Sequence, residues 1–106
     1  MKKIIYNKLV RDKIPEIIEQ TGKSCTYSIL SEEEYLNMLD AKLNEELAEY
    51  QEDKSMEELA DLLEVMKAVA LARGSSLEEV EEIRRAKANK RGGFEKKILL
   101  EEVIES

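Results

Sequence analysis

The sequence predicts a mainly α-helical protein, an antiparallel helical bundle in which a single domain spans residues 1–106. Three Ser-x-x-Glu sequences, beginning at Ser31, Ser55 and Ser76, each stand directly before a run with helical apolar spacing. A serine followed three residues later by glutamate is typical of a capped helix N-terminus. Three such starts in a chain of 106 residues leave little room for anything except helices and their connections.

The elements follow in order from the N-terminus. Residues 1–14 are expected to form an irregular or extended arm, and Pro15 suits the first turn of a short helix that Gly22 ends. The three capped helices are expected over residues 32–52, 56–73 and 77–90. The segment 24–30 is β-prone, and part of the C-terminal tail could pair with it as a two-stranded β element, about 25–30 with 97–100.

Composition narrows the possible functions. The chain has 24 acidic and 17 basic residues, a net charge of −7, which argues against nucleic acid as a partner. It has no histidine, which excludes His-rich zinc sites, and its one cysteine, Cys25, cannot form an internal disulfide. No apolar stretch is long enough for a signal peptide or a membrane span, so we expect a cytoplasmic protein without a membrane partner.

The second predicted helix, 32–52, carries a glutamate where an apolar residue is expected. Its apolar stripe consists of Tyr35, Leu39, Leu43, Leu47 and Tyr50. At about 100° per residue, Glu46 falls about 40° from the centre of this stripe, Glu49 lies at its edge and Glu45 points toward solvent. An ionised carboxylate inside an apolar stripe is costly unless a cation meets it. Lys42 lies on the same side and could orient a carboxylate or contact phosphate.

The next helix, 56–73, is apolar on two sides, and Glu58 and Asp61 project from its small-residue side. Residues three apart share a helix face, so we expect Glu46, Glu49, Glu58 and Asp61 to point into one space between the two helices. Oxygen ligands without histidine or thiolate favour Mg²⁺, with Mn²⁺ also possible. The alternative is that Glu58 only caps its helix and that Glu45 and Glu46 belong to a solvated face.

The two acidic motifs, Glu-Glu-x-x-Glu at 45–49 and Glu-x-x-Asp at 58–61, lie on consecutive predicted helices. This arrangement resembles the all-α nucleotide pyrophosphatase superfamily, which includes MazG-type enzymes, dimeric dUTPases and phosphoribosyl-ATP pyrophosphohydrolases. Segments 6–15 (Tyr-Asn-Lys-Leu-Val-Arg-Asp-Lys-Ile-Pro) and 90–94 (Lys-Arg-Gly-Gly-Phe) resemble the small house-cleaning branch related to MazG. The resemblance therefore extends over nearly the whole chain.

The resemblance implies a MazG-like helical bundle and a site for a nucleoside triphosphate. It assigns metal binding to the same four acids as the helical spacing does, and it assigns phosphate contacts to Lys87, Asn89 and Arg91, which precede Gly92 and Gly93. The connection at 50–57 is shorter than in many relatives, which constrains the turn and can alter the shape of the site.

The chemistry expected from this site is Mg²⁺-dependent hydrolysis of a nucleoside triphosphate to a monophosphate and pyrophosphate. Glu49 or Glu45 would position the attacking water or take its proton. Lys8 and Arg11 in the N-terminal arm, with Lys13, either contact the substrate or only neutralise the acidic helices.

Other functions fit the same residues. One is the phosphoribosyl-ATP pyrophosphohydrolase of histidine biosynthesis, against which the distinctive N-terminal arm argues. Another is a non-catalytic acidic helical interaction protein. A third is a regulator that binds the metal ion but does not catalyse a reaction. A small domain buries a modest fraction of its surface, and the family resemblance points the same way, so a homodimer or homotetramer is expected.

Overall fold

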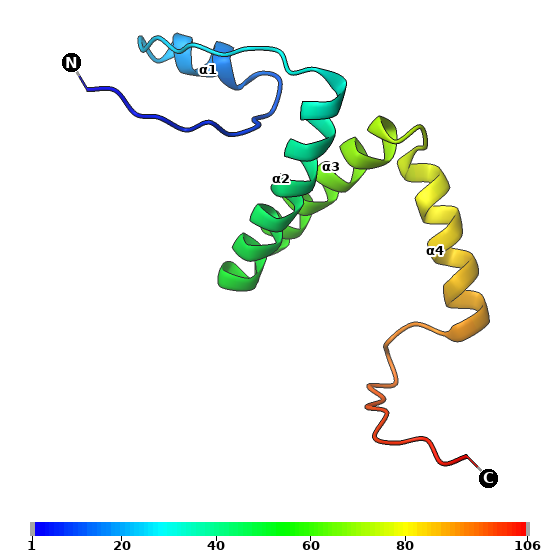
Figure 1. Cartoon of the computed structure of the whole chain (residues 1–106). Coiled ribbons are helices and arrows are strands. Elements are labelled where there is room, and N and C mark those ends of the chain that lie inside the picture. The colour runs from blue at the N-terminus through cyan, green and yellow to red at the C-terminus, as the bar shows by residue number, and fades with distance from the viewer. Residues whose placement is uncertain (1, 106) are drawn as a thin grey trace.

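Two long antiparallel helices, α2 (Glu32–Asp53) and α3 (Met56–Ala72), form the centre of the structure. In the computed structural model, which describes residues 2–105, these helices pack side by side as a hairpin (Figure 1). Near the open end of the hairpin, Nη2 of Arg73 lies 3.2 Å from Oδ2 of Asp40. At the closed end, Lys54 adopts a left-handed conformation with φ 58° and ends α2, and Ser55 begins the next helix at once. The short connection expected at 50–57 is therefore this tight turn.

The capping signatures predicted the helix starts correctly. The hydroxyl of each of the three cap serines accepts a hydrogen bond, at 3.1–3.2 Å, from the backbone N–H of the glutamate three residues later. Among the described residues, the full reciprocal capping box forms only at Ser31, where the Glu34 carboxylate accepts from the serine N–H. Glu58 accepts no such bond, and its carboxylate stays available for other partners.

The two remaining helices also agree with the expected boundaries. The short helix α1 (Ile14–Gln20) has a proline in its first turn, and Gly22 follows it with φ 87°. The last helix, α4 (Leu77–Arg91), ends at Gly92, whose φ of 88° is a conformation that glycine adopts without strain. None of the helices within residues 2–105 is both long enough and apolar enough to cross a membrane.

The expected β pairing is wrong: no strand forms within residues 2–105. The segment 24–30 runs back beside α1, where Sγ of Cys25 lies 3.8 Å from the carbonyl oxygen of Pro15. The tail segment 97–100 lies at the far end of the molecule, beyond α4 (Figure 1). A β-prone segment becomes a strand only when another backbone is within hydrogen-bonding reach, and these two segments have no such neighbour.

The helical architecture is more open than a closed bundle. Among the described helices, α4 contacts α3 but not α2, and α1 contacts none of the other three. The radius of gyration is 19.1 Å, against about 13 Å for a compact chain of this length. Leu39 and Ala70 are the apolar residues buried among those described, so the core of this single chain is very small.

Candidate metal centre

Three of the four predicted metal ligands meet between α2 and α3. Glu46 from α2 and Glu58 and Asp61 from α3 each offer one carboxylate oxygen, and these oxygens lie within 4.8 Å of one another. Glu46 is 7% exposed, as its place within the apolar stripe predicted. The two α3 acids share a face because they are three residues apart.

Two oxygens in this cluster have no hydrogen-bond partner. Oε2 of Glu46 and Oε2 of Glu58 are buried and have no hydrogen-bond partner. Lys42 reaches the opposite oxygen of Glu46, with Nζ 3.5 Å from Oε1. Buried polar atoms without partners are uncommon in folded proteins, and a set of hard oxygen donors suits a divalent cation such as Mg²⁺. The residues therefore fit the ion that the sequence predicted.

The electrostatics of the cluster are unfavourable without a cation. Burial raises the pKa of Glu46, the neighbouring Glu49 raises it further, and only Lys42 among the main influences opposes the shift. Burial also raises the pKa of Glu58, followed by the charges of Glu49 and Asp61. Both shifts mean that the folded protein disfavours the ionised carboxylates that a metal ion would stabilise.

These shifts predict a pH dependence for the metal-free protein. Since the pKa values of Glu46 and Glu58 are raised above 4.5 in the folded state, folding binds protons just above that pH. The free energy of unfolding should therefore fall as pH rises from about 4.5 through the raised pKa values of the two carboxyls, relative to the double variant Glu46→Gln/Glu58→Gln. Thermal melts in a metal chelator across this pH range measure the difference, and parallel curves for the two proteins would contradict it.

The N-terminal arm brings two cations to the acidic cluster. Nζ of Lys8 lies 2.9 Å from Oε1 of Glu45, and Nη2 of Arg11 lies 2.9 Å from Oδ1 of Asp61. These pairs join residues 37 and 50 positions apart, so the arm lies against the hairpin at the cluster. The sequence had left open whether these cations neutralise the acids or bind substrate, and in this structure they lie on the acids.

The two predicted catalytic glutamates lie in different surroundings. Glu45 is bonded by Lys8 and Lys42, and the bond from Lys8 is the main reason that its pKa is lowered. Glu49 is exposed and lies outside the group of three ligand oxygens, yet it is near enough to raise the pKa of both Glu46 and Glu58. Glu49 therefore borders the group formed by Glu46, Glu58 and Asp61, and its role as a fourth metal ligand stays a prediction.

The basic residues of α4 lie away from this cluster. Lys87, Asn89 and Arg91 are exposed on the last turns of a helix that leads away from the hairpin (Figure 1). Because α4 meets α3 near the start of α4 and its last turns lie away from the hairpin (Figure 1), the three side chains do not join the carboxylates of their own chain.

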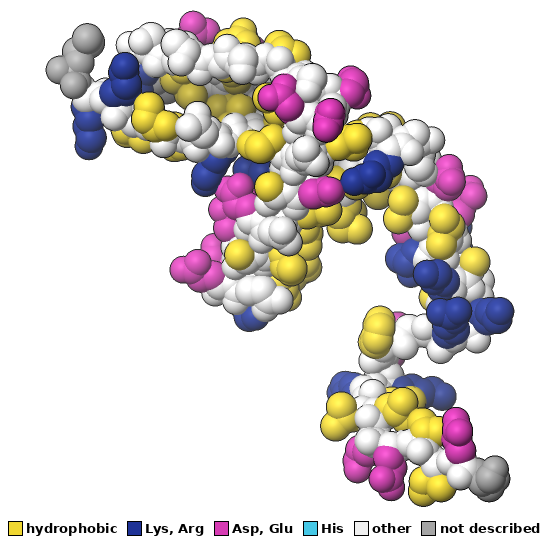
Figure 2. Space-filling model, viewed as in Figure 1, with side chains coloured by type: hydrophobic (Ala, Val, Ile, Leu, Met, Phe, Trp, Pro, Cys, Tyr) yellow, Lys and Arg dark blue, Asp and Glu magenta, His cyan; other side chains and the backbone are white. Residues whose placement is uncertain are grey.

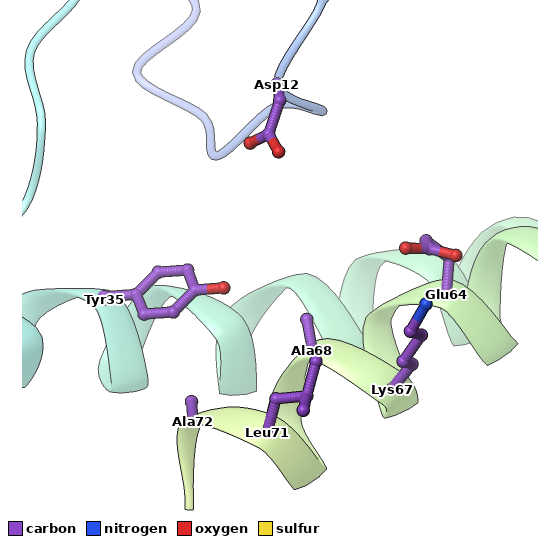
Figure 3. A pocket seen from close by; sticks show the side chains of 7 residues that line it. All are labelled: Asp12, Tyr35, Glu64, Lys67, Ala68, Leu71 and Ala72. Carbon is purple, nitrogen blue, oxygen red and sulfur yellow. The ribbon is translucent and has the colours of Figure 1, made fainter. Parts of the chain in front are cut away.

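A cavity of about 400 Å³ lies beside the cluster, between the arm and the hairpin. Figure 3 shows the Asp12 carboxylate on one side of this space and the Tyr35 hydroxyl directed into it from α2. Glu64 and Ala68 continue the face of α3 on which Asp61 lies, so the cavity begins about one helical turn beyond the cluster. Its full lining is Asp12, Tyr35, Glu64, Lys67, Ala68, Leu71 and Ala72.

Sequence reasoning did not single out Asp12 or Tyr35 as site residues. Tyr35 appeared only as a member of the apolar stripe, and its half-buried ring is consistent with that position. Asp12 follows Arg11 directly, and nothing local indicates which part of the helices the arm meets. The pairing of Arg11 with Asp61 holds this part of the arm, and with it Asp12, against the hairpin, and it connects positions 50 apart.

Comparison with known proteins adds a short partial similarity. No protein-family model matches the chain, and no solved structure matches it. A stretch of 41 residues is 54% identical to an uncharacterized protein of Mycolicibacterium smegmatis, covering 39% of this chain and 42% of that protein. The matched part is thus less than half of either protein, and the function must be argued from the site.

Proposed function

We propose that this chain is a Mg²⁺-dependent nucleoside triphosphate pyrophosphohydrolase of the MazG-like kind, which removes unwanted nucleotides by hydrolysing them to a monophosphate and pyrophosphate. The observation that carries the proposal is the carboxylate cluster of Glu46, Glu58 and Asp61, with two buried oxygens that lack partners. A triphosphate bound to Mg²⁺ is a ligand that such an acidic site can accept, since the ion offsets the repulsion between the two sets of negative charges.

Glu46, Glu58 and Asp61 hold the ion in this proposal. When bound, Mg²⁺ (or Mn²⁺) neutralises phosphate oxygens and favours deprotonation of a nearby water. Glu49 receives the proton of the attacking water, because it is exposed and stands beside the ligands without being one of the three. Glu45 is a poorer base, because its bonds to Lys8 and Lys42 lower its pKa. Its role is to hold these two lysines.

The cations around the cluster supply contacts for the phosphates. Lys42 is largely buried beside Glu46, and Lys8 and Arg11 reach the cluster from the arm. A triphosphate competes for these cations with the carboxylates that they now contact, and charge-assisted bonds to phosphate are strong. The cavity lined by Asp12 and Tyr35 accommodates the nucleoside, since its volume of about 400 Å³ suits a base and a ribose.

The enzyme is proposed to act in the cytoplasm, as a homodimer or homotetramer, without a nucleic-acid or membrane partner. Contacts from Lys87, Asn89 and Arg91 to the pyrophosphate then come from α4 of another copy, because α4 leads away from the cluster of its own chain.

A substrate panel tests the proposed function. Ordinary and modified nucleoside triphosphates and phosphoribosyl-ATP are incubated with the full chain, with and without Mg²⁺, and pyrophosphate release is measured. We expect at least one triphosphate to be hydrolysed only when Mg²⁺ is present. The control variant Glu57→Gln, altered at an exposed acid of α3, should release pyrophosphate at the wild-type rate. Preference for phosphoribosyl-ATP would favour the histidine-pathway alternative. Stabilisation by Mg²⁺ without hydrolysis would favour a metal-binding regulator. The absence of both stabilisation and hydrolysis would favour a non-catalytic interaction protein.

A further inference from the structure

The described part of the N-terminal arm, residues 2–13, is attached to the hairpin by very few contacts. Lys8 donates a hydrogen bond to Glu45 and Arg11 donates one to Asp61, and among the described residues these two bonds join the arm to the hairpin. Within residues 2–13 only Leu9 is half-buried, and the other side chains are exposed. Since the helix that follows, α1, contacts neither α2 nor α3, the position of the arm depends largely on the two ion pairs.

Both ion pairs end on the acidic motifs of the candidate metal centre. Asp61 belongs to the group of three acids whose carboxylate oxygens lie within 4.8 Å of one another, and its Oδ1 lies 2.9 Å from Nη2 of Arg11. Glu45 directly precedes Glu46, the buried member of that group. In Figure 2, dark-blue side chains meet magenta side chains where the arm joins the hairpin. The arm therefore brings positive charge to the same carboxylates that a divalent cation would bind.

The two ion pairs are open to solvent. The side chains of Lys8 and Arg11 are 51% and 59% exposed, and exposed ion pairs contribute little to stability because water and salt screen them. A divalent cation carries twice the charge and binds several carboxylate oxygens at once, including the buried Oε2 atoms of Glu46 and Glu58, which have no hydrogen-bond partner. Such an ion therefore prevails over the arm in the competition for Asp61.

We propose that the N-terminal arm is a lid on the metal centre, and that binding of a divalent cation releases it. The positive charges of the ion and of Arg11 repel each other when both are next to Asp61, so docking of the arm opposes occupation of the cluster. The coupling is reciprocal. Any change that weakens docking of the arm strengthens binding of the ion by the same factor.

Release of the arm also opens the cavity beside the cluster. Asp12 follows Arg11 directly, and its carboxylate lies on the arm side of that cavity, opposite Ala68 and Tyr35 (Figure 3). When Arg11 leaves Asp61, this wall withdraws and a ligand can enter between the arm and the hairpin. The next step rests on the proposed function: a nucleoside triphosphate enters after the ion, and its phosphates then hold Arg11 in place of the carboxylate.

Limited trypsin digestion of the full chain tests the inference with Mg²⁺ alone. Trypsin must bind the side chain of Lys8 or Arg11 to cleave after it, so docking of the arm protects both positions. Cleavage there should be at least about five-fold faster in Mg²⁺ than in a metal chelator. Cleavage after Lys96 and Lys97, which are exposed in the tail beyond α4, is the internal control and should proceed at the same rate in both conditions. Unchanged or slower cleavage of the arm in a chain that Mg²⁺ stabilises would overturn the inference.

The variant Arg11→Ala tests the reciprocal effect. It removes the ion pair with Asp61, so the Mg²⁺ concentration that gives half of the rise in melting temperature should fall at least about five-fold. The matched control is Lys13→Ala, which removes the same charge two positions further on, from a side chain without an ion pair to any described residue. Its Mg²⁺ midpoint should match the wild type, because salt screens a charge that is not at the cluster. Equal shifts in both variants would show an effect of net charge alone and would contradict the lid.

The lid and the proposed hydrolysis can fail separately. Release of the arm by Mg²⁺ in a chain that hydrolyses no nucleotide would support the lid and contradict the hydrolysis. Mg²⁺-dependent hydrolysis in a chain whose arm Mg²⁺ does not release would contradict the lid alone. A chain to which Mg²⁺ does not bind would overturn both.

Discussion

Replacing Asp61 with asparagine should lower Mg²⁺-dependent pyrophosphate release by at least about 100-fold, which corresponds to about 2.7 kcal/mol in the activation free energy. Asparagine has nearly the same shape as aspartate but no charge, so it weakens the ligand set formed with Glu46 and Glu58 without creating a cavity. The same change removes the acceptor for Arg11, whose Nη2 lies 2.9 Å from Oδ1 of Asp61. Initial rates at several Mg²⁺ concentrations measure the effect.

The variant Arg11→Ala separates these two consequences. It breaks the same ion pair but leaves all three carboxylates in place. We expect Arg11→Ala to keep the rise in melting temperature that Mg²⁺ produces in the wild type, and Asp61→Asn to lose it. Equal loss in both variants would mean that the arm, and not the carboxylate, is what Mg²⁺ stabilises.

Replacing Glu46 with glutamine should change stability and activity in opposite directions. Glu46 is 7% exposed, and burial and Glu49 raise its pKa, so its ionised form opposes folding when no cation is bound. The neutral amide removes this repulsion, and a gain of about 1 kcal/mol would raise the melting temperature of the metal-free protein by about 4–8 °C. The same variant should lose the stabilisation by Mg²⁺ and at least about 100-fold in pyrophosphate release, because a buried ligand is gone.

Glu45→Gln is the matched control for this experiment. Glu45 is the neighbouring residue, but its carboxylate is bonded by two lysines and its pKa is lowered. Neutralising Glu45 should therefore lower the stability of the metal-free protein, while Mg²⁺ should still raise its melting temperature. If the two glutamine variants shifted the melting temperature in the same direction, the assignment of Glu46 to a cation site would be wrong.

The parts of the fold that depend on neighbouring residues were predictable. Each cap serine bonds the N–H of the glutamate three positions later, and this local signal placed the starts of α2, α3 and α4 correctly. The burial of Glu46 followed in the same way, from its angle to an apolar stripe on its own helix. Glu58 and Asp61 share a face for the same reason of helical spacing.

The parts that depend on distant residues were not predictable in the same way. The segment 25–30 has the composition of a strand, yet the segment expected to pair with it lies beyond α4 and the two never meet. Glu49 belongs to the acidic motif, yet the three carboxylate oxygens that lie within 4.8 Å of one another are those of Glu46, Glu58 and Asp61, and Glu49 stands beside them. The arm residues Lys8 and Arg11 contact acids 37 and 50 positions away, and the sequence does not state which acids these are.

What the sequence alone determined is the set of helices, their caps and which acids share a face of one helix. Those features are fixed by backbone hydrogen bonds and side-chain spacing within one or two turns, where the chain itself holds the groups together. Only the tertiary structure decided which acids converge, which cations cross over them and which apolar faces remain uncovered. These contacts join segments that the chain leaves free to move apart, so they depend on how whole helix surfaces fit and not on any local pattern.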